Sequence, residues 1–198
     1  MTELQAEHAS ASAGDRGPLL AALRKTRPSA ALALLACAAV GASLPWRPRP
    51  LLVWNASASA RTGLYRITAP GRPRRGDTVV AWAPGWARRL AAARGYLPAT
   101  VPLVKPVAAA AGDRVCAKGS RILVNGHVAA VRRLHDMKGR PMPWWHGCRR
   151  LPRGELFLLS AGVGGAFDGR YFGVTRAGEL IGRARLLWAE PAKGPNDG

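Results

Sequence analysis

Residues 28–46, PSAALALLACAAVGASLPW, contain no charged side chain, although basic residues lie on both sides of them. A helix needs about 20 mostly apolar residues to cross the hydrocarbon core of a bilayer. The stretch is long enough for one such helix, and it has no polar face of the kind that a surface helix of a globular domain carries. We therefore expect one transmembrane anchor that divides the chain into two unequal parts.

The charges beside this stretch predict its orientation. A basic segment at 24–27 precedes it and favours a cytoplasmic N-terminus, while Arg47 and Arg49 on the far side weaken the bias. The alternative is a cleavable signal peptide, because the small residues GAS come directly before Leu44. The segment in front of the apolar stretch is unusually long for such a leader, so we favour a retained anchor.

The regions around the anchor differ in composition. Residues 1–27 are small, polar and unpatterned, which predicts a disordered cytoplasmic tail. Residues 47–53 contain RPRP and are expected to form a stiff, basic juxtamembrane linker. We assign residues 54–190 to one folded domain and residues 191–198 to a flexible C-terminal tail.

Short apolar runs separated by turn residues predict a mostly β fold for this domain. Asn125 and Gly126 lie between two such runs, which is a strong hairpin signal. Only GWARRLAAARGY at 85–96 has helical character. We expect an antiparallel β domain with one short helix. The clearest expected strand regions are 76–82, 119–131, 154–160 and 180–188.

The formal net charge of +19 indicates an anionic partner. Nucleic acid and the surface of an anionic membrane both attract such a chain, and the charge alone does not distinguish them. No run of Lys or Arg is longer than two residues, so the basic charge is spread over the chain and not concentrated in a tail.

Common catalytic motifs are absent from the sequence. It has no GxSxG elbow, no phosphate-binding GxxxxGK[ST] loop, and no CxxC or HExxH metal spacing. None of the histidines, at positions 8, 127, 135 and 146, lies in a sequence context that indicates a triad. We therefore expect no metal and no cofactor.

A serine and a lysine remain as candidates for nucleophile and base. Ser57 and Ser59 alternate in NASASARTGLY, and Lys105 is flanked by aliphatic residues in TVPLVKPVAAAAGDRV. Burial lowers the pKa of a lysine, so a neutral amine becomes able to accept a serine proton near neutral pH. Taken by itself, such a lysine more often extends its amine to the surface.

Several boxes in order resemble the bacterial type I signal peptidases, and in particular their conjugative-transfer (TraF-like) branch. NASASARTGLY resembles the nucleophile box, RRGDTVV at 74–80 resembles a conserved strand, and VKPVAAAAGD resembles the lysine box. FDGRYFG at 167–173 and LIGRA at 180–184 resemble the closing box. The boxes are spread over nearly the whole length of residues 51–188. The resemblance implies a coiled antiparallel sheet or partial barrel behind an N-terminal anchor.

The resemblance also implies roles for individual residues. Ser59 is expected to be the nucleophile and Lys105 the general base. Ser57 and the backbone N–H of Ser59 are expected to form the oxyanion hole. Asp168 and Arg170 are expected to support the site as a pair, a role that is compatible with an ordinary salt bridge.

The sequence departs from the family pattern at several positions. Arg61 stands where proline is usual, so the loop after the nucleophile is expected to be less rigid. Ala166 stands where a serine often hydrogen-bonds the lysine amine, which leaves the orientation of that amine open. Ala109 and Ala111 replace the usual glycine and proline.

The implied reaction is hydrolysis of a peptide bond, through an acyl-enzyme, in a membrane-tethered preprotein. The family cleaves after small residues, and this branch matures pilins or other transfer proteins. The expected location is the inner membrane, with the catalytic domain on the periplasmic side. Arginines beside anionic lipid then account for the charge, and no nucleic-acid partner is expected. The alternatives are a general leader peptidase and an inactive, basic, membrane-anchored binding module.

Cysteine and tryptophan give two further expectations. Cys116 and Cys148 belong to the exported domain, where a disulfide persists, so we favour a bridge over two free thiols; Cys37 lies in the anchor. Trp54 and the pair Trp144 and Trp145 are candidates either for the membrane interface or for the core.

Overall fold

The computed structural model describes residues 28–43 and 51–191, in two units that are considered separately. In the first unit, helix α2 covers Pro28–Ser43. No helix within the two described ranges is both long and apolar enough to be identified as a membrane span. The predicted anchor 28–46 extends past α2 into residues outside the described ranges. The predicted tail 1–27 and the last residues of the chain also lie outside these ranges. The membrane anchor stays a prediction.

The second unit is built mainly from a seven-stranded antiparallel sheet. Its strand order is β1-β2-β11-β3-β4-β9-β10, so the strands from the two ends of the domain lie side by side near one edge. Strand β1 begins at Leu52, inside the segment that the sequence assigned to the linker. The bounds are β1 Leu52–Asn55, β2 Gly63–Thr68, β3 Thr78–Ala81, β4 Leu103–Ala109, β9 Glu155–Leu158, β10 Thr175–Arg176 and β11 Leu180–Ala189.

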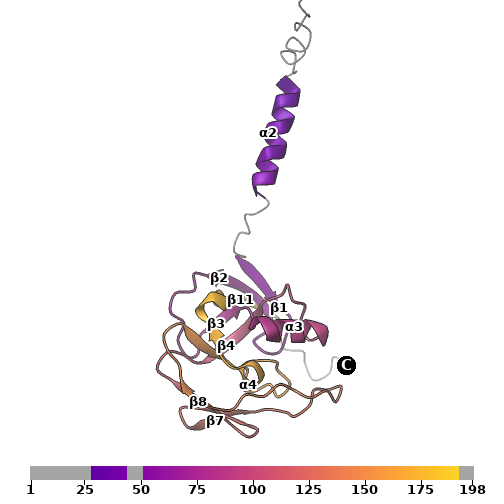
Figure 1. The fold of residues 1–198 in the computed structure, drawn as a ribbon. Helices are drawn as coiled ribbons and strands as arrows, with labels where there is room; N and C mark the ends of the chain where they lie inside the picture. The colour runs from indigo at the N-terminus through magenta and orange to yellow at the C-terminus, as the bar shows by residue number, and fades with distance from the viewer. Residues whose placement is uncertain (1–27, 44–50, 192–198) are drawn as a thin grey trace, which may run out of the picture. The chain divides into compact units, whose positions relative to one another are not determined.

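A smaller, four-stranded sheet has the order β7-β6-β5-β8. It lies at the end of the domain away from β1 and β2 (Figure 1). Asn125 and Gly126 join β6 to β7 with φ values of 49° and 87°, as a two-residue type I′ turn requires, so the predicted hairpin is confirmed. The bounds are β5 Arg114–Lys118, β6 Arg121–Val124, β7 His127–Val131 and β8 Gly147–Arg150.

Three short helical segments complete the domain. Helix α3, Gly85–Ala93, lies inside the region predicted to be helical and buries Ala87 and Ala91. The expectation of a single short helix is wrong, because the domain also contains α4 at Gly169–Phe172 and the 3-10 helix η1 at Ala177–Glu179. Both are single turns, which are too short to give an amphipathic period in the sequence.

The core connects the two sheets through β4 and β9. One group of buried side chains comes from neighbouring strands of the large sheet and includes Val79, Val107 and Leu158. Phe157, the residue before Leu158, belongs to a second group and packs with Ile122 of the small sheet. Successive side chains of a strand point to opposite faces, so β9 contributes to both groups. The residues that could carry chemistry are therefore attached to strands that are held from two sides.

Cys116 and Cys148 face each other across β5 and β8 and form a disulfide bond with an S–S distance of 2.12 Å. The bond connects the segment rich in proline and tryptophan before β8 to the small sheet. Within that segment Trp145 packs edge-on against Phe157 and donates to the carbonyl oxygen of Gly169 at 2.9 Å. Trp144 lies under the guanidinium of Arg132. For this pair the structure therefore favours packing within the domain over the membrane interface.

Candidate active site

Asn55, the last residue of β1, holds the loop that carries both serines. Its buried amide nitrogen lies 2.9 Å from the carbonyl oxygen of Ser57 and 3.1 Å from those of Ala60 and Arg61. Its carbonyl oxygen accepts from the backbone N–H and from the hydroxyl of Ser57. One side chain thus satisfies polar groups along the whole turn, which fixes where Ser59 can lie. The sequence contained this asparagine in a recognised box but gave it no role.

The glycine after this loop is required by a close approach of two strands. Gly63 has a φ of 149°, and a β-carbon at this position would lie 2.1 Å from the carbonyl oxygen of Trp188 in β11. Any side chain would therefore separate β2 from β11. Tyr65, two residues on, is buried and donates to the carbonyl oxygen of Arg61 at 2.7 Å, so it supports the loop that contains Arg61 from within the core.

The hydroxyls of Ser57 and Ser59 are hydrogen bonded to each other, with 2.6 Å between the two oxygens. Each hydroxyl has one hydrogen, so Ser57 cannot donate to Asn55 and to Ser59 at the same time. In the described chain Ser59 Oγ makes no hydrogen bond to Lys105. Nucleophilic attack by Ser59 would therefore require its side chain to rotate away from Ser57.

Lys105 lies in the middle of β4, opposite Val79 of β3, and its side chain is only 4% exposed. The amine is thus inside the domain and does not extend to the surface. Burial lowers the pKa of Lys105 to about 8; the charge of Asp168 acts in the opposite direction and that of Arg170 in the same direction. A substantial fraction of this amine is neutral near physiological pH.

Ser160, two residues after β9, connects the lysine to the serine loop. Its hydroxyl accepts from Lys105 Nζ at 3.4 Å and donates to the carbonyl oxygen of Ser59 at 2.6 Å. The sequence left the orientation of the amine open, because Ala166 replaces a serine; in the structure Ser160 supplies a hydroxyl partner for the amine. In the sequence, Ser160 is the last residue of a run, 154–160, that predicts only a strand. Its contacts with Lys105 and Ser59 depend on the path of the chain after β9.

Asp168 and Arg170 form a buried ion pair directly behind Ser160. Arg170 Nε and Nη2 donate to the two carboxylate oxygens at 2.8 and 3.0 Å, and the two side chains are 0% and 1% exposed. Asp168 accepts from the backbone N–H of Ser160, and Arg170 donates to the carbonyl oxygen of Ser160 at 2.7 Å. The pair holds the backbone of Ser160 and reaches Lys105 through it.

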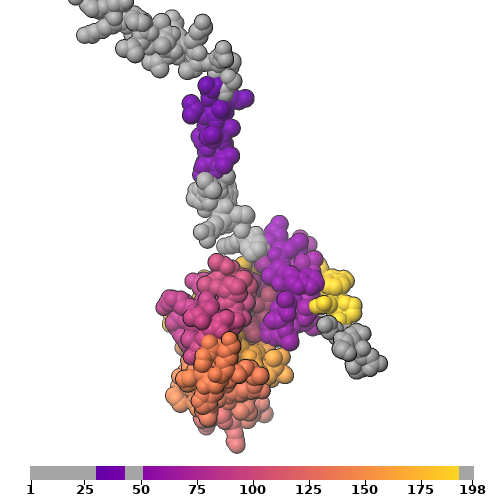
Figure 2. Space-filling model, turned by 90° about the vertical axis from the view of Figure 1, so that its right-hand side faces the viewer, coloured from indigo at the N-terminus to yellow at the C-terminus, as the bar shows by residue number. Residues whose placement is uncertain are grey.

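Ser57, Ser59 and Lys105 line one cleft of about 720 Å³, together with residues from β1, from the segment 94–105 and from the loops 133–142 and 163–171. Most of the lining is apolar. In Figure 2 the purple chain of β1 and β2, the magenta chain around α3 and the orange chain of the later loops meet on one face.

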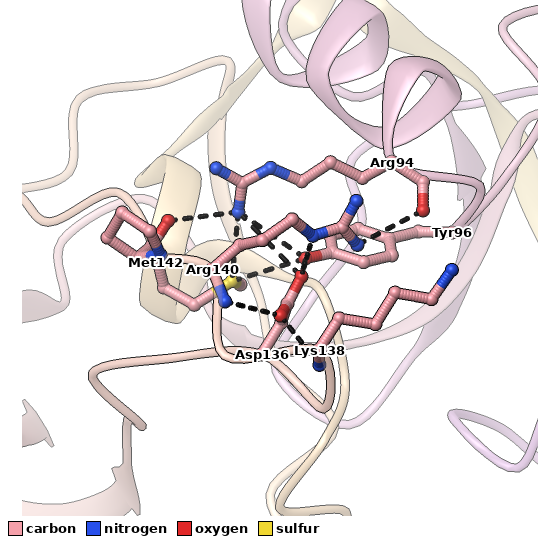
Figure 3. Close-up of polar contacts among 7 residues, drawn as sticks. Arg94, Tyr96, Asp136, Lys138, Arg140 and Met142 are labelled. Carbon is pink, nitrogen blue, oxygen red and sulfur yellow. Dashed lines mark hydrogen bonds and ion pairs between the residues drawn. The ribbon is translucent and has the colours of Figure 1, made fainter.

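A group of polar contacts joins the segment directly after α3 to the loop before β8, and both line the cleft (Figure 3). Asp136 accepts from the Tyr96 hydroxyl and, at 2.7 Å, from Nε of Arg140. Arg94 Nη1 donates to the carbonyl oxygen of Pro141 at 2.9 Å. Burial by itself would raise the pKa of Asp136. Its hydrogen bonds with Tyr96 and Arg140 have the opposite and larger effect, so the pKa of this carboxyl lies well below its usual range. This carboxylate stays charged and ties the loop to the end of α3.

Histidine and the metal-ligating side chains are the other groups in the described ranges that could carry chemistry. No group of three or more His, Cys, Asp or Glu side chains gathers there in a way that could hold a metal ion. His135 lines the cleft, but within the part of the chain that is described it makes no hydrogen bond to Ser57 or Ser59. The titratable group that contacts the serine loop through one intervening hydroxyl is Lys105.

The chain resembles known proteins over most of its length. Residues 24–189 match the family model described as signal peptidase, peptidase S26. The chain is 38% identical over 141 residues to a probable conjugal transfer protein TraF of Sinorhizobium fredii (strain NBRC 101917 / NGR234), covering 66% of this chain and 73% of that protein. It is 31% identical over 145 residues to the plasmid transfer protein TraF of Escherichia coli, covering 69% and 77%. A crystal structure of a signal peptidase I from Enterococcus faecalis V583 matches with a TM-score of 0.34 at 16% identity, over 58% of this chain and 98% of that one.

Proposed function

The chain belongs to the signal peptidase S26 family and is TraF-like within it, and on this premise we propose that it is a serine endopeptidase with a Ser59–Lys105 dyad. The observation that carries the proposal is the buried Lys105 amine, with a pKa lowered to about 8, in the same cleft as Ser59. A lysine on an exposed strand would be almost entirely protonated at neutral pH and unable to act as a base.

The proposed chemistry begins with the neutral Lys105 amine. The Ser59 side chain turns from Ser57 toward Nζ, the amine takes the hydroxyl proton, and Oγ attacks the carbonyl carbon of the scissile bond. The negative charge that develops on the carbonyl oxygen is stabilised by the Ser59 backbone N–H and the Ser57 hydroxyl. The Lys105 ammonium then protonates the departing amine, and water, activated by Lys105, hydrolyses the acyl-enzyme.

The cleft also supports a proposal for the substrate. Strand β1 is an outer strand of the large sheet, and Val53, Trp54 and Asn55 line the cleft. A peptide lying extended beside such an edge gains main-chain hydrogen bonds, and shallow apolar pockets select small alternate side chains. Since both relatives are named as transfer proteins, we propose the precursor of a pilin or another conjugative-transfer protein as the substrate.

The proposed location is the inner membrane, with the N-terminus in the cytoplasm and the catalytic domain in the periplasm. Helix α2 has no charged residue, and Leu32, Leu34 and Leu35 are more than two-thirds exposed on it. In the domain, Trp54 and Trp188 stack with 5.6 Å between their ring centroids, and both are half exposed. Leu51 before β1, Leu52 in β1 and Leu187 in β11 are also exposed. Exposed tryptophan and leucine suit the interface of a bilayer, so this patch is proposed to contact lipid.

The test is cleavage of a purified pilin precursor by the full chain in detergent. Ser59→Ala and Lys105→Ala are each expected to abolish cleavage without loss of the folded state. Ser120→Ala and Lys118→Ala, which change exposed residues of the small sheet and its turn, are the matched controls and should cleave normally. Undiminished cleavage by Ser59→Ala would refute the dyad. A binding module without activity would show no cleavage in the wild-type chain.

A further inference from the structure

We propose that Ser160 is the positioning residue for the Lys105 base, and that it does this by joining the amine to the backbone of the nucleophile. The inference rests on the proposed Ser59–Lys105 function and adds a residue that the family motifs did not point to. It concerns a hydroxyl that contacts both residues of the proposed dyad, Lys105 through its amine and Ser59 through its backbone carbonyl.

The argument starts from the hydrogen-bonding capacity of the Ser160 hydroxyl. Its single hydrogen is donated to the carbonyl oxygen of Ser59 at 2.6 Å, so toward Lys105 the oxygen acts as an acceptor. Lys105 Nζ therefore donates to Ser160 in either protonation state. A neutral amine that donates one N–H in this direction has its lone pair directed elsewhere and available to a second hydroxyl.

The same contact fixes the nucleophile. The carbonyl that receives the Ser160 hydrogen belongs to Ser59, the residue whose Oγ would attack the substrate. Ser59 is also held from the other side, because Asn55 bonds the carbonyls of its neighbours Ser57 and Ala60. Ser160 thus sets the distance between the base and the loop that carries the nucleophile, a separation on which proton transfer depends strongly.

Ser160 can set this distance because its own backbone is immobilised. It is 3% exposed, its N–H donates to Asp168, and its carbonyl oxygen accepts from Arg170. Those two side chains are also the charged groups that act on Lys105, Asp168 raising and Arg170 lowering its pKa. The supporting pair therefore acts on the base by two routes: through its charges and through the position of Ser160.

The experiment compares Ser160→Ala and Ser160→Thr with the surface control Ser120→Ala. For each full-length variant in detergent, kcat and KM for the pilin precursor are measured from pH 6 to 10. Ser160→Ala is expected to lower kcat by about 100-fold with little change in KM, because the base is misplaced while the cleft is unaltered. Ser160→Thr keeps the hydroxyl and should recover most of the rate, and Ser120→Ala should match the wild type.

The pH profile separates positioning from a structural role. Without the Ser160 oxygen the buried ammonium has one acceptor fewer, so the acidic limb of the Ser160→Ala profile should move to lower pH. If the substitution only loosened the structure and admitted water, the limb would move to higher pH, toward an ordinary lysine. A shift in that direction, or an unchanged kcat, would overturn the proposal.

Two controls keep the outcomes distinct. If Ser160→Ala does not fold, Ser160→Cys preserves the size of the side chain but bonds weakly, and the same kcat loss and shift are required of it. If Ser59→Ala and Lys105→Ala abolish cleavage while the folded Ser160 variants behave as wild type, this inference fails and the dyad stands. If the dyad variants still cleave, the proposed function fails first.

Discussion

Replacing Lys105 with methionine should make the protein more stable while removing its activity. Methionine has a similar length and is apolar, so it fills the same buried site in β4 without a charge. Ser160 would lose the hydrogen bond from the amine but keep its bond to the carbonyl oxygen of Ser59. A buried donor left without an acceptor is the usual reason that such a substitution destabilises a protein, and this substitution leaves none.

The magnitude follows from the pKa of the amine in the two states. Burial lowers it from 10.5 in the unfolded chain to about 8 in the folded one. At about 1.4 kcal/mol per pH unit, keeping the ammonium buried costs about 3 kcal/mol of stability. This cost is complete below pH 8, where both states are protonated. Between pH 8 and 10.5 only the folded chain has lost the proton, so the cost shrinks as pH rises, and above 10.5 it is gone.

The assay is urea unfolding of the full chain in detergent, followed by tryptophan fluorescence at pH 7 and at pH 10. At pH 7 Lys105→Met should exceed the wild type in free energy of unfolding by about 3 kcal/mol. At pH 10 most of this difference should disappear. Lys118→Met, on an exposed residue of β5, is the control and should match the wild type at both pH values. The reasoning is refuted if Lys105→Met is less stable at pH 7, or if its advantage is the same at pH 10.

Three further expectations come from individual contacts. For the wild type, the rate of precursor cleavage at low substrate should rise about tenfold per pH unit below pH 8 and then level off, because Lys105 must be neutral to act; a limb near pH 6.5 would instead indicate a histidine. Asn55→Ala removes the amide that holds the serine loop and should cost about 1–3 kcal/mol in urea unfolding and lower kcat; a variant with normal kcat would show that the loop does not need it. Thr175→Val should stabilise the domain by about 1 kcal/mol, because the buried Thr175 hydroxyl has no partner within the described ranges; a loss of stability would indicate an unseen partner.

The regular elements of the domain were largely visible in the sequence. Strands β3 and β9 and the β6–β7 hairpin lie within the regions expected to be strands, β11 extends one residue past its expected region, and α3 lies within 85–96. These elements depend on local patterns, such as alternating apolar residues and an Asn-Gly turn, which neighbouring residues already define. The short helices α4 and η1 were missed because a single turn is stabilised by its surroundings and leaves no period in the sequence.

The candidate site was predictable to a smaller extent. The boxes placed Ser59, Lys105, Asp168 and Arg170 in one family site, and the structure brings the last three together with Ser160. The sequence gave no signal for the contacts of Ser160, which is the last residue of a run of strand character. The orientation of the amine, which Ala166 left open, is set by a hydrogen bond to another serine, Ser160, two residues after β9.

By itself the sequence determined what kind of chain this is: an uncharged helical stretch, a β domain with a known hairpin, and the ordered boxes of a peptidase family. Only the tertiary structure decided that Lys105 is buried, that Trp145 packs against the core while Trp54 stays half exposed, and that Ser160 contacts both Lys105 and the backbone of Ser59. The physical reason is that periodicity and turn chemistry act between neighbours in the chain. Burial, a lowered pKa and a hydrogen bond between residues 59 and 160 instead depend on which strands pack together.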